Sequence, residues 1–206
     1  MSVDAAHSVG PPAGFGKFGT IDRVMIGLIV FLASEVMLFG AFFTAFFYIR
    51  YQGTYTVFPP HPYDIPKDLT GINTFILVSS SFTMHWALVS VKRNNRLGLV
   101  LGIFLTLGLG LTFLGIQMYE YRHIGFTPES GAFASTFFCL TGLHGAHVFL
   151  GATLLAIALV RSLRGHYSPE HHMGVELTGI YWHFVDFVWV ILFAIVYLVA
   201  PTHYGV

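Results

Sequence analysis

The sequence is poor in cysteine and in charge. It contains a single cysteine, Cys139, which excludes an internal disulfide framework. Lys, Arg, Asp and Glu together make up 10% of the chain, and their formal charges cancel. Since a soluble domain is about 25% charged, this composition excludes an ordinary soluble protein. The zero net charge also argues against nucleic acid as a partner, and no phosphate-binding glycine loop or dinucleotide fingerprint is found.

Long apolar segments dominate the chain instead, which is 55% hydrophobic. A membrane-spanning helix needs about 20 mostly apolar residues. Segments of this length occur at Val24–Ile49, Leu69–Val91, Leu97–Tyr119, Gly131–Val160 and Gly174–Val199. The sequence therefore predicts an all-α integral membrane bundle of five transmembrane helices. A polar tail over residues 1–20 precedes this single membrane domain, which covers residues 21–206.

The basic residues predict the orientation of the bundle, because cytoplasmic loops carry an excess of Lys and Arg. Most of them fall on the side of the N-terminus: Lys17, Arg23, Lys92, Arg93, Arg96, Arg161 and Arg164. Only three fall on the opposite side: Arg50, Lys67 and Arg122. We therefore expect the N-terminus in the cytoplasm, and an odd number of spans then places the C-terminus outside.

Several ionisable side chains lie at membrane depth. An ionisable group inside a bilayer is costly unless it faces protein or water. Spacing of three residues puts two such groups on one helical face, and we expect the faces of different helices to meet. The predicted result is one buried polar seam made of Glu35, His144, His147, Glu176, His183 and Asp186.

Three interpretations of this seam remain open from the residues alone. The seam can be a set of contacts that hold helices together without chemistry. It can bind a metal or a di-metal centre, since His and carboxylates are suitable ligands, although the repeated Glu-x-x-His pairs of di-iron bundles are missing. It can also relay protons or ions across the membrane. A stand-alone membrane metalloprotein or transporter therefore remains an alternative.

Two further groups of polar or aromatic residues are candidates for other roles. Trp182 and Trp189 are one heptad apart in the last span, so they could line a groove for a lipid together with His183. Gln117 and Glu120 close the third span at its outer end. No residue is predicted to be catalytic.

Four segments together carry a resemblance to a known family. They are LASEVMLFGAFF, LGIQMYEY, ASTFFCLTGLHGAHVFLGATLL and YWHFVDFVWVILFAIVYL. In order and spacing they resemble subunit III of the haem–copper terminal oxidases, which include the cytochrome c oxidases. The mitochondrial-type subunit has seven spans, so this chain resembles the shorter five-span bacterial form. Related five-span proteins occur in quinol oxidases and with nitric oxide reductases.

The resemblance implies a subunit that binds no redox centre itself. Haem and copper are then expected in partner subunits, mainly subunit I, beside which subunit III packs. The complex would reduce oxygen to water and translocate protons, with cytochrome c favoured over quinol as donor. Subunit III would support stability, phospholipid binding and proton uptake in the bacterial cytoplasmic membrane. His7, on the expected side of proton entry, is a candidate proton-collecting residue.

Overall fold

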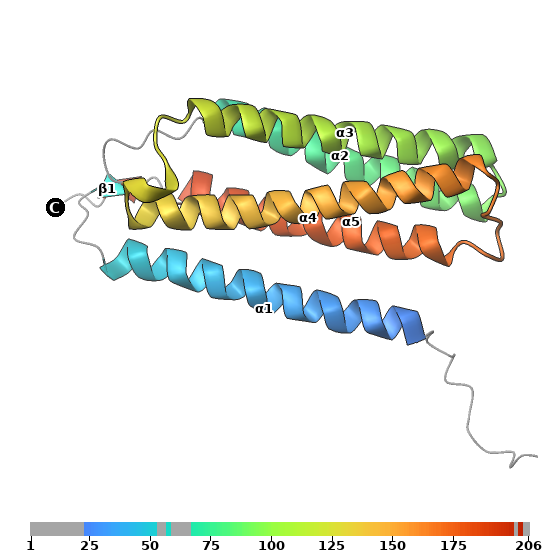
Figure 1. Cartoon of the computed structure of the whole chain (residues 1–206), viewed down its shortest axis with the longest axis horizontal. Coiled ribbons are helices and arrows are strands. Elements are labelled where there is room, and N and C mark those ends of the chain that lie inside the picture. Colours follow the sequence, from blue (N-terminus) through green and yellow to red (C-terminus); the bar gives the residue numbers. More distant parts are fainter. Residues whose placement is uncertain (1–22, 53–56, 59–66, 200–201, 204–206) are drawn as a thin grey trace, which may run out of the picture.

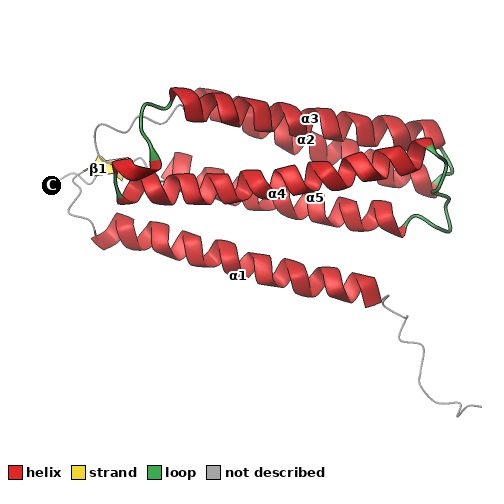
Figure 2. Cartoon of the chain, in the orientation of Figure 1, coloured by secondary structure: helices red, strands yellow, loops and turns green. Residues whose placement is uncertain are grey.

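The computed structural model describes residues 23–52, 57–58, 67–199 and 202–203. Within this part of the chain, five helices are long and apolar enough to cross a membrane. They are α1 (Arg23–Gln52), α2 (Lys67–Lys92), α3 (Arg96–His123), α4 (Ala132–Leu163) and α5 (Met173–Phe193). Each predicted span coincides with one of these helices, so the predicted five-helix membrane fold is confirmed (Figure 2).

Smaller elements complete the described structure. A π-helical segment, η2 (Ala194–Val199), continues α5, and a short 3₁₀ helix, η1 (Pro128–Ser130), precedes α4. Two short strands, β1 (Val57–Phe58) and β2 (Thr202–His203), pair antiparallel and connect the segment after α1 to the C-terminal segment. Strands of two residues have no periodicity that a sequence pattern could reveal. The predicted tail, including His7, lies outside the described residues.

The helices α2 to α5 form a bundle in which each packs against two neighbours, and α1 lies outside it (Figure 1). α2 packs on α3 and α5, and α4 packs on the opposite sides of the same two helices. α1 rests on α4 and, to a smaller extent, on α5. Within the most apolar 18-residue stretch of each helix, 6% of the residues of α1 are buried, against 50% for α5. α5 is therefore central to the fold, and α1 is peripheral.

The two ends of the bundle differ in charge. One end, called the basic end below, carries Arg23, Lys92, Arg93, Arg96, Arg161 and Arg164, and it lies on the right in Figure 1. The connections at this end are short and have ordinary turn chemistry. Asn94 takes a positive φ of 55°, which asparagine tolerates. The Asn95 side chain caps α3 by accepting from the Gly98 amide at 3.0 Å.

Small residues allow α2 to approach its neighbours closely. A Cβ added at Gly102 of α3 would lie 2.7 Å from the Cβ of Ala87, and one at Gly179 of α5 would lie 2.9 Å from Leu88. Close backbone approach of this kind favours helix association in a membrane, where water does not drive helices together. The interior of the bundle is therefore specified by shape and by polar contacts more than by hydrophobicity.

Candidate functional site

Glu35 of α1 and His147 of α4 form the clearest contact between ionisable groups at membrane depth. The distance from His147 Nε2 to Glu35 Oε2 is 2.8 Å. His147 Nδ1 lies 2.8 Å from the carbonyl oxygen of Leu143, to which it can only donate. The pair therefore shares one further proton, held either by the carboxyl group or by Nε2. This contact attaches the peripheral α1 to the bundle, as the predicted meeting of these two faces requires.

His144 lies one turn from His147 but has a different environment. Its side chain is fully buried, and neither ring nitrogen has a hydrogen-bond partner among the described residues. The ring packs against aromatic neighbours, with its centroid 4.7 Å from that of Trp189 and 5.8 Å from that of Phe113. His144 therefore fills the core as an aromatic ring and does not join a carboxylate, contrary to the predicted seam.

His183 and Asp186 of α5 meet a serine of α2. The Ser81 hydroxyl donates to Asp186 Oδ2, and His183 Nδ1 lies 3.1 Å from Ser81 Oγ. Asp186 is 5% exposed, and its second oxygen, Oδ1, has no donor among the described residues. No hydrogen bond or ion pair between described residues connects this group with Glu35 or His147. The single predicted seam is therefore divided into separate interhelical contacts.

Glu176 does not belong to the interior at all. It lies at the basic end, where its Oε1 is 2.9 Å from Lys92 Nζ and 3.2 Å from His172 Nε2. Its side chain is 32% exposed. Glu176 and His183 are seven residues apart and share a helical face, but Glu176 is in the first turn of α5 and reaches Lys92 at the charged end of α2. The prediction that it is part of a buried seam is wrong.

Trp182 and Trp189 lie inside the bundle, so the prediction that they line a lipid groove is wrong. They are 0% and 1% exposed. Each indole donates to a hydroxyl of α2: Trp182 Nε1 to Ser80 Oγ at 2.8 Å, and Trp189 Nε1 to Thr74 Oγ1 at 3.0 Å. Burial of a tryptophan requires a partner for its N–H, and α2 supplies both. These two residues connect α5 to α2.

Glu120 and Gln117 lie near the end of α3 that is opposite the basic end, and both are buried between helices. Glu120 accepts from Thr70 of α2 at 2.8 Å and from Tyr197 of η2 at 3.1 Å. Gln117 donates to the Thr141 carbonyl of α4 at 3.1 Å. Because both residues lie near the end of an apolar helix, their position in the sequence does not reveal that their side chains are buried. In the structure they join α3 to three other elements.

The geometry favours interhelical contact over metal binding. Among the described residues, no group of three or more His, Cys, Asp and Glu side chains is placed to hold a metal ion. Apart from His144, the polar groups described above join two helices, as polar side chains in membranes commonly do. The contacts also show which functional partners sequence reasoning missed. They are the small hydroxyl residues Thr70, Thr74, Ser80 and Ser81, whose only signal is their recurrence along one face of α2.

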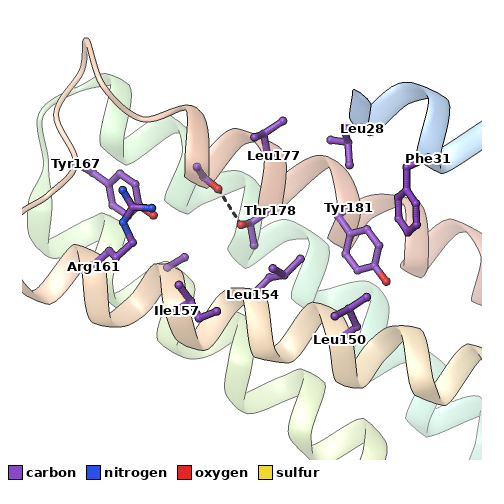
Figure 3. A pocket seen from close by; sticks show the side chains of 12 residues that line it. Leu28, Phe31, Leu150, Leu154, Ile157, Arg161, Tyr167, Leu177, Thr178 and Tyr181 are labelled. Atoms are coloured by element: carbon purple, nitrogen blue, oxygen red, sulfur yellow. Dashed lines mark hydrogen bonds between the residues drawn. The ribbon is translucent and has the colours of Figure 1, made fainter. Parts of the chain in front are cut away.

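A cavity of about 380 Å³ lies between α1, α4 and α5 near the basic end. Its walls are apolar, and Leu28 and Phe31 of α1 face Leu154 and Tyr181 across it (Figure 3). Arg161 and Tyr167 lie together at one end of the cavity, with the guanidinium carbon 5.2 Å from the ring centroid. An apolar channel with a cation at its mouth has the chemistry of a phospholipid site.

Comparison with known proteins identifies the family. The sequence model described as Cytochrome c oxidase subunit III matches residues 13–200. Cytochrome c oxidase subunit 3 of Thermostichus vulcanus is 40% identical over 178 residues, which cover 86% of this chain and 88% of the relative. The Synechocystis subunit is 40% identical over 200 residues, covering 96% and 85%.

The animal subunits are nearly as similar but longer. Cytochrome c oxidase subunit 3 of Drosophila melanogaster is 40% identical over 180 residues, covering 83% of this chain and 67% of the relative. The match to the family model covers residues 13–200, which include all five helices. The chain therefore belongs to the cytochrome c oxidase subunit III family.

Proposed function

We propose that this chain serves its oxidase complex as a structural subunit that binds phospholipid and packs beside subunit I. The cavity between α1, α4 and α5 is the observation that carries this proposal. Haem and copper belong to the other subunits, and cytochrome c is the proposed donor to the complex. The chain supports proton uptake and durable turnover through its contacts with the subunits that react with oxygen.

The proposed occupant of the cavity is one acyl chain of a phospholipid whose headgroup lies at the basic end. Its walls between α1 and α4 suit an acyl chain, since Leu28, Phe31, Leu150, Leu154 and Ile157 present only carbon there. Arg161 is exposed at the mouth, where a guanidinium can bind a phosphate with two hydrogen bonds. Burial raises the pKa of the Tyr167 phenol above its usual range, against the opposing effect of Arg161. The phenol therefore stays protonated and can donate to the same phosphate.

Replacing Arg161 with glutamine is expected to weaken retention of an anionic phospholipid about tenfold, since a charged hydrogen bond contributes ~1.5 kcal/mol or more. Lipid retained by the purified complex is measured by mass spectrometry after detergent washing. The matched control is Arg164→Gln, because Arg164 lies at the same end but does not line the cavity. Equal loss of lipid from both variants, or from neither, would contradict the assignment.

The charge of the two ends supports a location of the basic end in the cytoplasm. Positively charged loops remain on the cytoplasmic side during insertion, and the described residues Arg23, Lys92, Arg93, Arg96, Arg161 and Arg164 share one end. With five spans, this proposal puts the end of α5 on the outer side of the membrane. We propose the cytoplasmic membrane of a bacterium as the location, with subunit I beside this chain.

Purification of the chain from its native membrane tests the oxidase assignment. The complex isolated through a tag on this chain is expected to show the absorbance of haem and to consume oxygen when reduced cytochrome c is supplied. A colourless preparation of this chain alone, from gently solubilised membranes, would count against it.

Deletion of residues 1–15 tests the proposed proton-collecting role of His7. Unchanged turnover of the complex across pH 6–9 would remove that role.

A further inference from the structure

The hydrogen-bonded group of Ser81, His183 and Asp186 lies at the side of the bundle between α2 and α5, where His183 reaches the surface. The surface around it, called the α2–α5 face below, consists of Ser81, Phe82 and His85 of α2 and His183, Phe187 and Val190 of α5. Phe82, Phe187 and Val190 are 74%, 65% and 44% exposed. His85 is exposed and His183 is partly exposed. The face therefore has a polar centre with apolar side chains around it.

The hydrogen bonds within this group determine what His183 presents outward. With Asp186 ionised, Ser81 gives its only proton to Asp186, and His183 Nδ1 donates to the Ser81 oxygen. The neutral imidazole then carries no proton on Nε2, which is an acceptor. Nε2 has no hydrogen-bond partner among the described residues and is not a buried atom. His183 therefore offers one unsatisfied acceptor at the surface of the chain.

The depth of His183 limits what can satisfy that acceptor. His183 follows the start of α5 at Met173 by three turns, which is about 15 Å at 1.5 Å per residue. The hydrocarbon core of a bilayer is about 30 Å thick, so Nε2 lies near its middle. Acyl chains have no hydrogen-bond donor, and phospholipid headgroups remain at the interface. Polar groups at this depth face protein or a water-filled cavity.

The outer face of α1 provides the contrast. Its most exposed large side chains include Val30, Val36 and Met37, at 65%, 57% and 77%. These groups need no hydrogen-bond partner, so lipid satisfies them fully. Of the two faces, only the α2–α5 face combines, at mid-membrane depth, exposed aromatic residues with an unsatisfied polar atom. Such a combination, aromatic anchors around a polar group, is typical of protein interfaces.

We propose that a transmembrane helix of a neighbouring oxidase subunit docks on the α2–α5 face and donates a hydrogen bond to His183 Nε2. A hydroxyl, amide or cationic side chain at mid-membrane depth supplies the donor, and Phe82 and Phe187 pack against the same helix. This assignment rests on the proposed function, because it requires that the chain sits in an oxidase complex. It goes further by assigning the surface at which the complex is held together.

Spin-label accessibility in the intact complex tests the docking surface. Single cysteines replace Phe82 and Phe187, and the control cysteine replaces Met37, all in a Cys139→Ser background. Each carries a nitroxide, and its relaxation by dissolved oxygen is measured in lipid nanodiscs. Oxygen concentrates in lipid, so labels at positions 82 and 187 are expected to be several-fold less accessible than the label at position 37. Lipid-like accessibility at both positions would overturn the docking surface.

Two substitutions of His183 test the hydrogen bond itself. Glutamine keeps an acceptor at this position, whereas leucine of similar size has none. After detergent washing, we expect the haem-containing complex to retain the His183→Gln chain and to lose most of the His183→Leu chain. Equal retention of the two variants would overturn the hydrogen bond to a partner. A wild-type chain that purifies without haem would instead contradict the oxidase assignment, so the two failures are distinguishable.

Discussion

Replacing Trp182 with alanine is expected to lower the free energy of unfolding of the subunit by about 2–3 kcal/mol. A buried Trp→Ala change in a soluble protein costs about 3–5 kcal/mol. The cost is smaller here because a separated helix leaves its tryptophan in lipid and not in water. The cavity left behind, and the Ser80 hydroxyl that loses its donor, remain to be compensated. Denaturant titration in mixed micelles measures the change.

The surroundings of Trp182 supply matched controls. A Cβ added at Gly110 would lie 2.5 Å from the Trp182 ring, and one at Gly151 would lie 2.9 Å from it. Gly110→Ala is therefore expected to be destabilising in the wild type and close to neutral in the Trp182→Ala background. Nothing lies within 4 Å of a Cβ added at Gly108, so Gly108→Ala should have little effect in either background. Additive effects of Gly110→Ala and Trp182→Ala would contradict the packing argument.

The helices were predictable from sequence because a bilayer imposes a length and a composition on every span. Within the described residues, the sequence does not predict the short β1–β2 ladder, the 3₁₀ helix η1, the π-helical form of η2 or the last few residues at the helix ends. Hydrophobicity cannot, however, show which face of a span is buried. Phe82 is 74% exposed and Phe113 is 0% exposed, yet both lie in apolar helices. Lipid and protein interior are equally apolar, so the sequence pattern that marks a core in a soluble protein is missing here.

The same reason explains which site residues were predicted. Glu35 and His147 stand out because an ionisable group in an apolar span needs a partner, and the structure joins them. The burial of Trp182 depends on the space left by Gly110 and Gly151, which lie in other spans. The sequence of the last span alone therefore does not show that Trp182 is buried, and it predicts a position at a lipid groove. Ser81 was overlooked because serine is common in membrane helices and its importance comes only from Asp186 and His183. The roles of Trp182 and Ser81 thus depend on contacts between segments that are distant in the sequence, which a sequence pattern does not show.

Replacing His147 with leucine is expected to be the most damaging single change to the attachment of α1. It leaves Glu35 without its partner at membrane depth, where loss of one member of a buried pair costs about 3–5 kcal/mol. Because the Glu35 side chain is 14% exposed and not fully buried, we expect a value near the lower limit, about 3 kcal/mol. The same denaturant titration measures it, with α1 release followed by proteolysis of the connection after α1.

The double variant distinguishes a lost contact from a lost shape. Glu35→Leu combined with His147→Leu removes both polar groups, so the unpaired carboxyl group no longer opposes folding. We expect the double variant to be more stable than His147→Leu alone, with a coupling energy of about 1–3 kcal/mol. Glu35→Gln should be mild, because an amide N–H can donate to the unprotonated Nε2 that the Leu143 contact leaves on His147. A double variant that is less stable than His147→Leu would show that the pair acts through packing and not through its shared proton.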